Sequence, residues 1–366
     1  MDILGLIQEN VLTPIVLFFL LGIVAARIKS DLKIPEAISE FLPIYLLAAI
    51  GLHGGIEMRK TGFESMLIPM LAAIALSLLM TLNHYQILRR LGKFNVFDSY
   101  ALASTYGAVG ATTFSVGLSF LRSHGIESEG YITAILAVLE PLAFILAIFL
   151  TNMAVAKQVQ AKKRTLATDT ESDRKIDSSL DMLEVGQGKT KLFKVLRESI
   201  TGKAVVILIG SIVIGYMIGY EKFAPIKILF EDLFIGAIVI FLIEMGIIAG
   251  QRLDDVRKAG AFLIGFSLII PTANGIIGVF VATFLGLSVG GAVMFGLLFA
   301  SASFIAAPAV LRTAMPQAKP SLYITSALGI TFPYNIIILL PVMLTISSMI
   351  HDGGAINLFD YLGQSS

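Results

Sequence analysis

The sequence contains no cysteine and no tryptophan, and only 14% of its 366 residues are charged. Without cysteine the protein has no disulfide, no thiol nucleophile and no cysteine-ligated metal. Its four histidines, His53, His84, His124 and His351, are scattered without the spacing of metal ligands. We find no P-loop, HExxH or nucleophile-elbow motif, so the sequence indicates neither an enzyme nor a bound cofactor. The net charge of +1 and the lack of a basic cluster outside short loops give no sign of a nucleic-acid partner.

What the chain does have is apolar sequence. Hydrophobic residues make up 56% of it, and the mean hydropathy is +0.85. Soluble domains carry roughly 25% charged residues, and apolar runs of about 20 residues are long enough to cross a bilayer. The sequence therefore predicts an all-α integral membrane protein with ten transmembrane helices. We place these spans near residues 11–28, 37–56, 64–88, 97–121, 129–154, 203–220, 226–250, 259–286, 288–311 and 321–349.

The polar stretch 156–202 divides the chain into two halves, 1–155 and 203–366, with five predicted spans each. This stretch lacks a sustained apolar period, so we expect a partly disordered linker. Lys and Arg concentrate after the odd-numbered spans, as Arg89 and Arg90 do after the third. By the positive-inside rule these loops and the linker face the cytoplasm, and both termini face outward, in a multi-pass protein of the cell membrane.

Five spans before a cytoplasmic linker and five after it imply halves that enter the membrane from opposite sides. Short matches recur in the same order in both halves. Tyr131-Ile132-Thr133 recurs as Tyr323-Ile324-Thr325, and Ala111-Thr112-Thr113-Phe114 aligns with Ser301-Ala302-Ser303-Phe304. We interpret the halves as inverted five-helix repeats, in which the fourth and ninth spans correspond.

Glycines interrupt the fourth span where it lies deepest in the membrane. Gly107 and Gly110 allow the backbone to turn, and a second half-helix would then begin with its free amides pointing inward. Transporters with inverted repeats bind substrate where two such broken helices meet. We therefore predict a small-anion site made by the residues of both breaks, against the alternative of simple tight helix packing. The predicted anion-binding residues are Gly107, Gly110, Ala111, Thr112, Thr113, Ser301, Ala302 and Ser303.

A carboxylate, Glu140, lies deep in the fifth span and precedes Pro141. An ionisable group at such a depth costs roughly 2.5–3.5 kcal/mol by insertion scales, so it is a candidate sodium ligand or proton carrier. A structural hydrogen bond to a neighbouring helix is the alternative. Asn335, after Pro333, suits either an ion ligand or a partner for carbonyls freed by the proline. The predicted coupling-ion residues are Glu140, Thr113, Ser115, Ser303 and Asn335.

Several motifs resemble the sodium-dependent bicarbonate transporter family, best known from cyanobacterial uptake permeases. They are Ile34-Pro35-Glu36-Ala37-Ile38-Ser39, Gly51-Leu52-His53-Gly54-Gly55, Gly107-Ala108-Val109, Pro308 and Leu311-Arg312. The resemblance implies two inverted five-helix repeats with crossing broken helices four and nine. It also implies a homotrimer, an elevator-like motion, and a bicarbonate and sodium (Na+) site in spans four and nine. Relatives bind a PII-like trimeric regulator at the cytoplasmic face, so such a partner is expected here.

This chain departs from the family pattern at one break. The resemblance implies Ser-Ser-Ser-Asp-Ile-Ser in the ninth span, whereas the chain reads Ser301-Ala302-Ser303-Phe304-Ile305-Ala306. Losing a carboxylate weakens a sodium site, because the ion needs charged oxygens in place of its water. The sequence therefore leaves three functions open. The first is sodium–bicarbonate symport, the second a permease for another small anion or organic acid with proton or altered coupling, and the third an anion-sensing receptor or scaffold.

Overall fold

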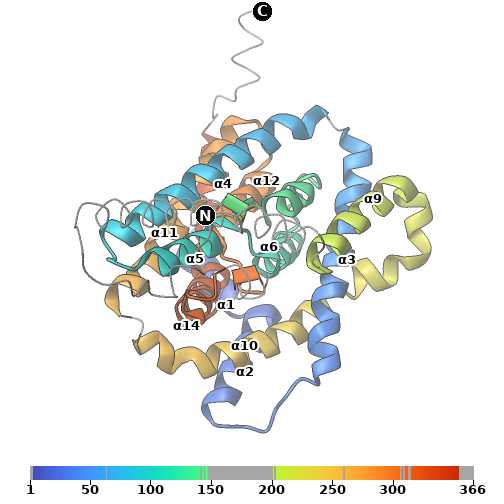
Figure 1. The fold of residues 1–366 in the computed structure, drawn as a ribbon. Coiled ribbons are helices and arrows are strands. Elements are labelled where there is room, and N and C mark those ends of the chain that lie inside the picture. The colour runs from blue at the N-terminus through green and yellow to red at the C-terminus, as the bar shows by residue number, and fades with distance from the viewer. Residues whose placement is uncertain are drawn as a thin grey trace, which may run out of the picture.

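The computed structural model describes residues 3–62, 64–140, 142, 143, 145, 146, 201, 203–258, 260–305, 307, 310, 311 and 315–353. These residues are helical, with turns and extended connections and no strand among them (Figure 1). The predicted linker 156–202 lies outside the described residues except for Thr201. The all-helical prediction is confirmed for the part of the chain that the structure describes.

Six helical segments of the described chain are long and apolar enough to cross a membrane. A seventh is present if the bent pair formed by residues 4–11 and 14–27, which meet at 63°, counts as one span. Six predicted spans match these segments to within a few residues at most boundaries. Span four consists of two shorter helices, and the described helix of span nine, Val289–Ala300, covers only its first half. The first-half helices are α1 (Ile3–Val11), α2 (Pro14–Arg27), α3 (Glu36–Thr61), α4 (Glu64–Arg90), α5 (Val96–Gly107) and α6 (Ala111–Ser123).

The second half continues from α9 to α16, with tighter and wider helical turns inserted between α-helices. Its elements are α9 (Lys203–Phe223), η2 (Ala224–Ile226), η3 (Ile228–Asp232), α10 (Phe234–Lys258), α11 (Ala261–Phe284), α12 (Val289–Ala300), α14 (Pro320–Ile324), η4 (Thr325–Thr331), α15 (Phe332–Tyr334), η5 (Asn335–Leu339) and α16 (Leu340–Asp352). Of these, η3, η4 and η5 are π-helical. Such wide turns are rare and often mark functional sites.

The helices form two packed groups (Figure 1). In the first group, α9 packs along α3 and α2 along α10. Close approach depends on glycine: a Cβ on Gly55 would overlap the carbonyl oxygen of Ile212, and one on Gly22 that of Ile243. In the second group α4, α5, α6, α11, α12 and α16 pack together with η4 and η5. Small residues are common at helix crossings in membrane proteins. The hydrophobic effect does not drive helices together in lipid, so their association depends on close packing.

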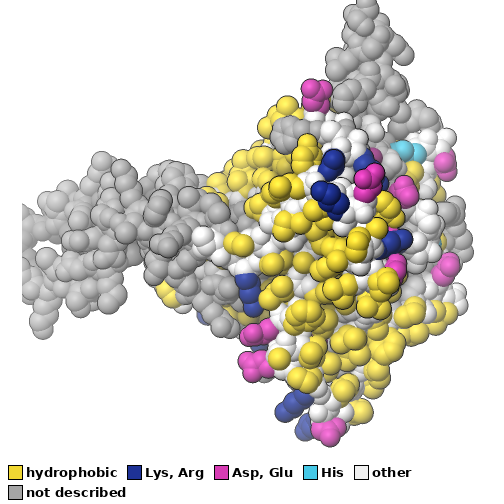
Figure 2. Space-filling view, turned by 90° about the vertical axis from the view of Figure 1, so that its right-hand side faces the viewer, with side chains coloured by type: hydrophobic (Ala, Val, Ile, Leu, Met, Phe, Trp, Pro, Cys, Tyr) yellow, Lys and Arg dark blue, Asp and Glu magenta, His cyan; other side chains and the backbone are white. Residues whose placement is uncertain are grey.

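The outer face of the first group is apolar. Val206, Val213 and Met217 on α9 are exposed by 54%, 51% and 70%. Figure 2 shows hydrophobic side chains over much of this side of the molecule, with charged ones gathered at its upper right and lower left. An exposed apolar band between polar ends fits a bilayer rather than water.

The N-terminal helix α1 was not predicted. It packs against α16 and η5 of the second group, although α2, which follows it, packs against α10 of the first. Asn10 of α1 is 3% exposed, and its Nδ2 donates to the carbonyl oxygens of Ile336, at 2.7 Å, and Ile337, at 3.1 Å. The chain thus crosses from one group to the other at the bend around Thr13, whose side chain caps α2.

Candidate functional site

The fourth predicted span is broken at the predicted place. Helix α5 ends at Gly107, Ala108 and Gly110 have extended backbones, and α6 begins at Ala111. No side chain caps α6, so its first amides have no partner within the helix. The carbonyl oxygen of Gly107 accepts a hydrogen bond from Ser77 of α4 at 3.2 Å. The break therefore leaves the positive end of a helix inside the protein.

A second break follows α12. Ala300 is its last residue, and Ser301 has an extended backbone (φ −81°, ψ 165°). Helical conformation is seen again at Ala307, Val310 and Leu311. The carbonyl oxygen of Ala300, left without a partner in its own helix, accepts a hydrogen bond from Nδ2 of Asn335 at 2.8 Å.

The two breaks contact each other directly. The Gly110 amide donates to Oγ of Ser301 at 2.8 Å, and the Ser303 amide donates to the carbonyl oxygen of Thr105 at 2.9 Å. Each break thus supplies a partner for the backbone of the other. An unpaired buried amide costs on the order of 1–3 kcal/mol, so this reciprocal bonding stabilises both interruptions. The alignment of Ala111–Phe114 with Ser301–Phe304 predicted this meeting.

A cavity of about 60 Å³ lies beside the breaks, between the two groups of helices. The two breaks and the residues beside them contribute Gly110, Ala111, Thr112, Ser115, Ser303, Phe304 and Ile305, and the helical stretch 132–140 contributes Glu140. The first group contributes Pro43, Ile44, Leu46 and Leu47 of α3, Lys203 of α9 and Phe241 of α10. Since about 10–15 Å³ is enough for one water molecule, the space is large enough for a few water molecules or a small polyatomic ion.

The polar groups at the cavity are buried and incompletely paired. Glu140 is 4% exposed, and its Oε2 has no hydrogen-bond partner among the described residues. The hydroxyls of Thr112 and Ser303 make no hydrogen bond to any residue that the structure describes, whereas Ser115 Oγ donates to the Ala111 carbonyl at 2.9 Å. Buried polar groups are normally satisfied, so a cavity that leaves several unpaired is suited to a polar ligand.

The family of the chain can now be stated. A family model described as the Na+-dependent bicarbonate transporter superfamily matches residues 14–348. The chain belongs to this superfamily. No curated protein matches it. Membership in a transporter family agrees with the absence of any catalytic motif, and it makes the protein a membrane transporter rather than an enzyme.

In this member of the superfamily, the predicted site residues divide into two sets. Gly110, Ala111, Thr112, Ser115, Glu140 and Ser303 line the cavity. The other predicted residues, Gly107, Thr113, Ser301, Ala302 and Asn335, do not line it but are buried behind it. Among them, Ser301 and Asn335 hold the broken backbones through their hydrogen bonds. The Oδ1 of Asn335 has no partner in the described part of the chain, so this side chain keeps one acceptor free.

Sequence reasoning missed Lys203. This lysine, the first residue of α9, lines the same cavity as Glu140 and comes from the opposite group of helices. A lysine at the end of an apolar run ordinarily indicates only the membrane boundary. The one signal available was its position directly after the linker, at the start of the span that packs against α3.

Proposed function

We propose that this protein takes up bicarbonate by sodium symport, with the anion bound at the cavity between the broken helices. The observation that supports this proposal most directly is the contact between the two breaks beside a cavity with unpaired polar groups. The family relationship supplies the substrate class and the coupling ion.

The anion would bind at the start of α6, where the Ala111 and Thr112 amides and the Thr112 hydroxyl provide donors. Lys203 would add a positive charge from the facing wall. Sodium would bind nearby through Glu140, the hydroxyls of Thr113, Ser115 and Ser303, and the free Oδ1 of Asn335. Anion and cation would favour each other's binding, because opposite charges attract strongly in a low-dielectric cavity.

The arrangement of the cavity also supports alternating access by an elevator-like motion. The polar lining comes mostly from the group that holds α6, whereas α3 and α10 contribute an apolar wall. An apolar wall forms no hydrogen bonds that would have to break, so it would allow one group to slide past the other with the ions enclosed. We further propose ten spans in two inverted repeats, a homotrimer in the cell membrane with both termini outside, and a cytoplasmic linker that can receive a PII-like regulator.

A second candidate is proton-coupled transport of another small anion. Phe304, which is 9% exposed, occupies the cavity wall and leaves Glu140 as the one carboxylate there among the described residues. One buried carboxylate is sufficient to carry a proton but is a poor sodium site without further charged oxygens.

Uptake of radiolabelled bicarbonate into proteoliposomes separates these functions. Sodium symport requires accumulation driven by an inward sodium gradient. Accumulation that ignores sodium and follows an imposed pH gradient would favour the second candidate. Binding of bicarbonate with no net flux under either gradient would refute both and favour an anion-sensing receptor.

A further inference from the structure

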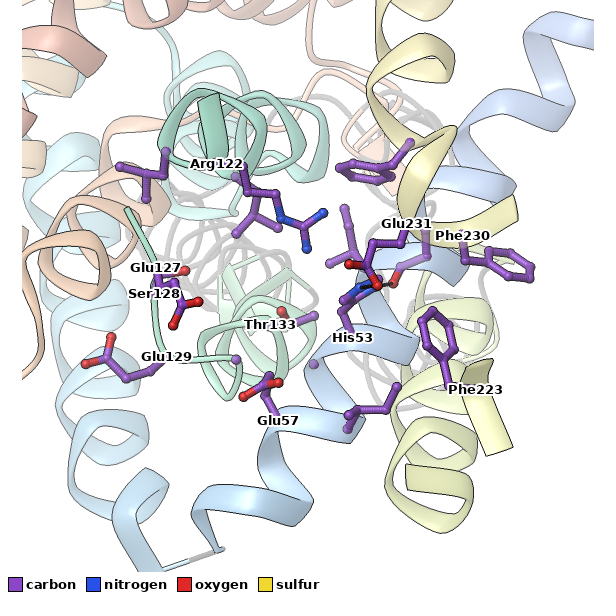
Figure 3. A pocket seen from close by; sticks show the side chains of 18 of the residues that line it. His53, Glu57, Arg122, Glu127, Ser128, Glu129, Thr133, Phe223, Phe230 and Glu231 are labelled. Carbon is purple, nitrogen blue, oxygen red and sulfur yellow. Dashed lines mark hydrogen bonds and ion pairs between the residues drawn. The ribbon is translucent and has the colours of Figure 1, made fainter. Parts of the chain in front are cut away.

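A second, larger cavity lies at the other end of α6. It has a volume of about 610 Å³, and we call it the vestibule (Figure 3). Its walls are formed by α3, the end of α6, residues 126–130 and 133, and the segment from Tyr220 to Ile235. The vestibule and the smaller cavity share two helices. Ile50 of α3 and Phe114 of α6 line the vestibule, whereas Leu47 and Ser115 line the smaller cavity.

Most of the carboxylates in the vestibule are already paired. Glu57 accepts a hydrogen bond from Nζ of Lys60 at 2.6 Å. Glu231 lies 3.3 Å from Nε2 of His53 and forms an ion pair with Lys227 at 3.7 Å, and its charge raises the pKa of the exposed Lys227. These contacts reduce the repulsion that five acidic side chains would otherwise exert on an anion.

Glu129 is also paired, in this case through hydrogen bonds to the N-terminal end of a helix. Its Oε1 accepts from the Ser288 amide at 2.7 Å, and its Oε2 accepts from the Ser288 hydroxyl at 3.1 Å. Ser288 is the N-cap of α12, so the carboxylate lies at the positive end of that helix. Glu127 and Asp232 are the remaining acidic side chains of the vestibule.

Arg122 differs from the other cations of the vestibule. It lies in the last turn of α6, and Figure 3 shows its side chain pointing into the cavity toward the side where Glu231 and His53 lie. Its guanidinium lies 5.7 Å from the centroid of the Phe234 ring, an arrangement that holds a cation without neutralising it. The charge of Glu231 acts on this guanidinium, but no carboxylate among the described residues lies within ion-pair distance of it. Lys60, in contrast, is engaged by Glu57.

We propose that Arg122 is an anion-capture residue, at which a small oxyanion binds in the vestibule before it reaches the smaller cavity. This inference rests on the proposed function and adds a second, earlier binding position to it. A guanidinium presents two parallel N–H groups that match the two oxygens of a carboxylate-like anion such as bicarbonate. The recognition therefore rests on this local contact and not on the net charge of the vestibule, whose lining holds more acidic than basic side chains. The captured anion would then lie on the same half-helix whose opposite end faces the smaller cavity.

The test compares Arg122→Gln with Lys60→Gln in proteoliposomes that expose a single face of the protein. Both variants remove one positive charge from the same vestibule, but only Lys60 forms a direct ion pair with a carboxylate. We expect Arg122→Gln to raise the KM for bicarbonate about tenfold from the vestibule side, because the variant loses charge-assisted hydrogen bonds to the anion. Its maximal rate and its KM from the other side should stay within about twofold of wild type, and Lys60→Gln should have a KM near wild type. The KM difference between wild type and Arg122→Gln should shrink at high ionic strength.

Each other outcome contradicts the inference. An unchanged KM in Arg122→Gln, or equal changes in the two variants, would refute anion capture at Arg122 while wild-type uptake still supports the proposed function. A lower maximal rate at unchanged KM would show that Arg122 acts in the motion and not in binding. If Arg122→Gln does not fold, Arg122→Lys provides the test, because lysine keeps the positive charge but lacks the two parallel N–H groups of the guanidinium. An unchanged KM in Arg122→Lys would refute capture of the anion by two parallel hydrogen bonds. Absence of bicarbonate uptake by the wild type would refute the proposed function and this inference together.

Discussion

Gly110 is the position at which the meeting of the two breaks is most sensitive to substitution. Its backbone angles, φ −99° and ψ 103°, are allowed for any residue. A larger residue is therefore disfavoured by steric overlap with its neighbours and not by backbone strain. A Cβ would lie 2.9 Å from the carbonyl oxygen of Ala302, 3.2 Å from Thr113 Oγ1 and 3.3 Å from Ser301 Cβ. The nearest of these atoms belongs to backbone, so relief requires the two breaks to separate.

Gly110→Ala should therefore weaken both the fold and the site. Overpacking of this kind costs about 1–3 kcal/mol, and lengthening the bond from the Gly110 amide to Ser301 adds about 1 kcal/mol. Because 1.4 kcal/mol corresponds to a factor of ten, we expect bicarbonate uptake at low substrate concentration to fall about tenfold or more. A lower thermal midpoint in detergent should accompany the loss.

The matched control is Gly265→Ala in α11, where a Cβ would meet no atom within 4 Å. Alanine favours a helix interior by about 1 kcal/mol over glycine, so this variant should keep wild-type uptake and be no less stable. If Gly110→Ala matches Gly265→Ala in both uptake and thermal midpoint, the close contact of the two breaks is not needed for transport, and the site assignment fails.

Three further substitutions test separate parts of the structure. Glu140→Gln should raise the sodium concentration for half-maximal uptake about tenfold, since it removes a full charge from the cavity; an unchanged sodium dependence in flux assays would exclude Glu140 as an ion ligand. Asn335→Ala leaves the Ala300 carbonyl unpaired and should lower the free energy of unfolding by about 1–3 kcal/mol. The loss should appear as a lower thermal midpoint, and a midpoint equal to that of wild type would contradict this. Asn10→Ala removes the bonds to Ile336 and Ile337, so amide hydrogen exchange in α1 should quicken while exchange in α2 stays slow; parallel changes in both helices would show that they do not belong to separate groups.

The helix breaks could be predicted from the sequence because their signals are local. Gly107 and Gly110 interrupt one apolar run, and the hydroxyl-rich Ser301–Ser303 interrupts another. Their contact could be predicted as well, since the short matches between the halves paired the same two stretches. Ser301 and Ser303, which form hydrogen bonds across the interface, belong to one of those stretches, and Gly110 directly precedes the other; Thr105, which accepts from the Ser303 amide, was not predicted.

Other features could not be predicted, because they depend on contacts between distant residues. Nothing near Asn10 in the sequence indicates that its amide reaches carbonyls of η5. Lys203 is an ordinary boundary lysine until packing of α9 on α3 brings it to the cavity. Asn335 was a candidate ion ligand or a partner for carbonyls freed by Pro333; its amide nitrogen instead bonds to the carbonyl freed at the break after α12. The ten-helix inverted repeat, the linker and the trimer stay predictions.

The hydrogen bonds of the two breaks explain why we propose a ligand site on one side of them. Breaking a helix inside a membrane leaves backbone groups that must find partners. Behind the cavity they do so within the protein, through Gly110 with Ser301, Ser303 with Thr105, and Asn335 with the carbonyl of Ala300. On the cavity side the first amides of α6 have no partner within their helix, and no side chain caps them. A cap such as Ser or Asp at position 110 would satisfy one of these amides but would bring a side chain into the contact with Ala302. Gly110 thus keeps the two breaks in contact and leaves the first amides of α6 uncapped, as the proposed anion site requires.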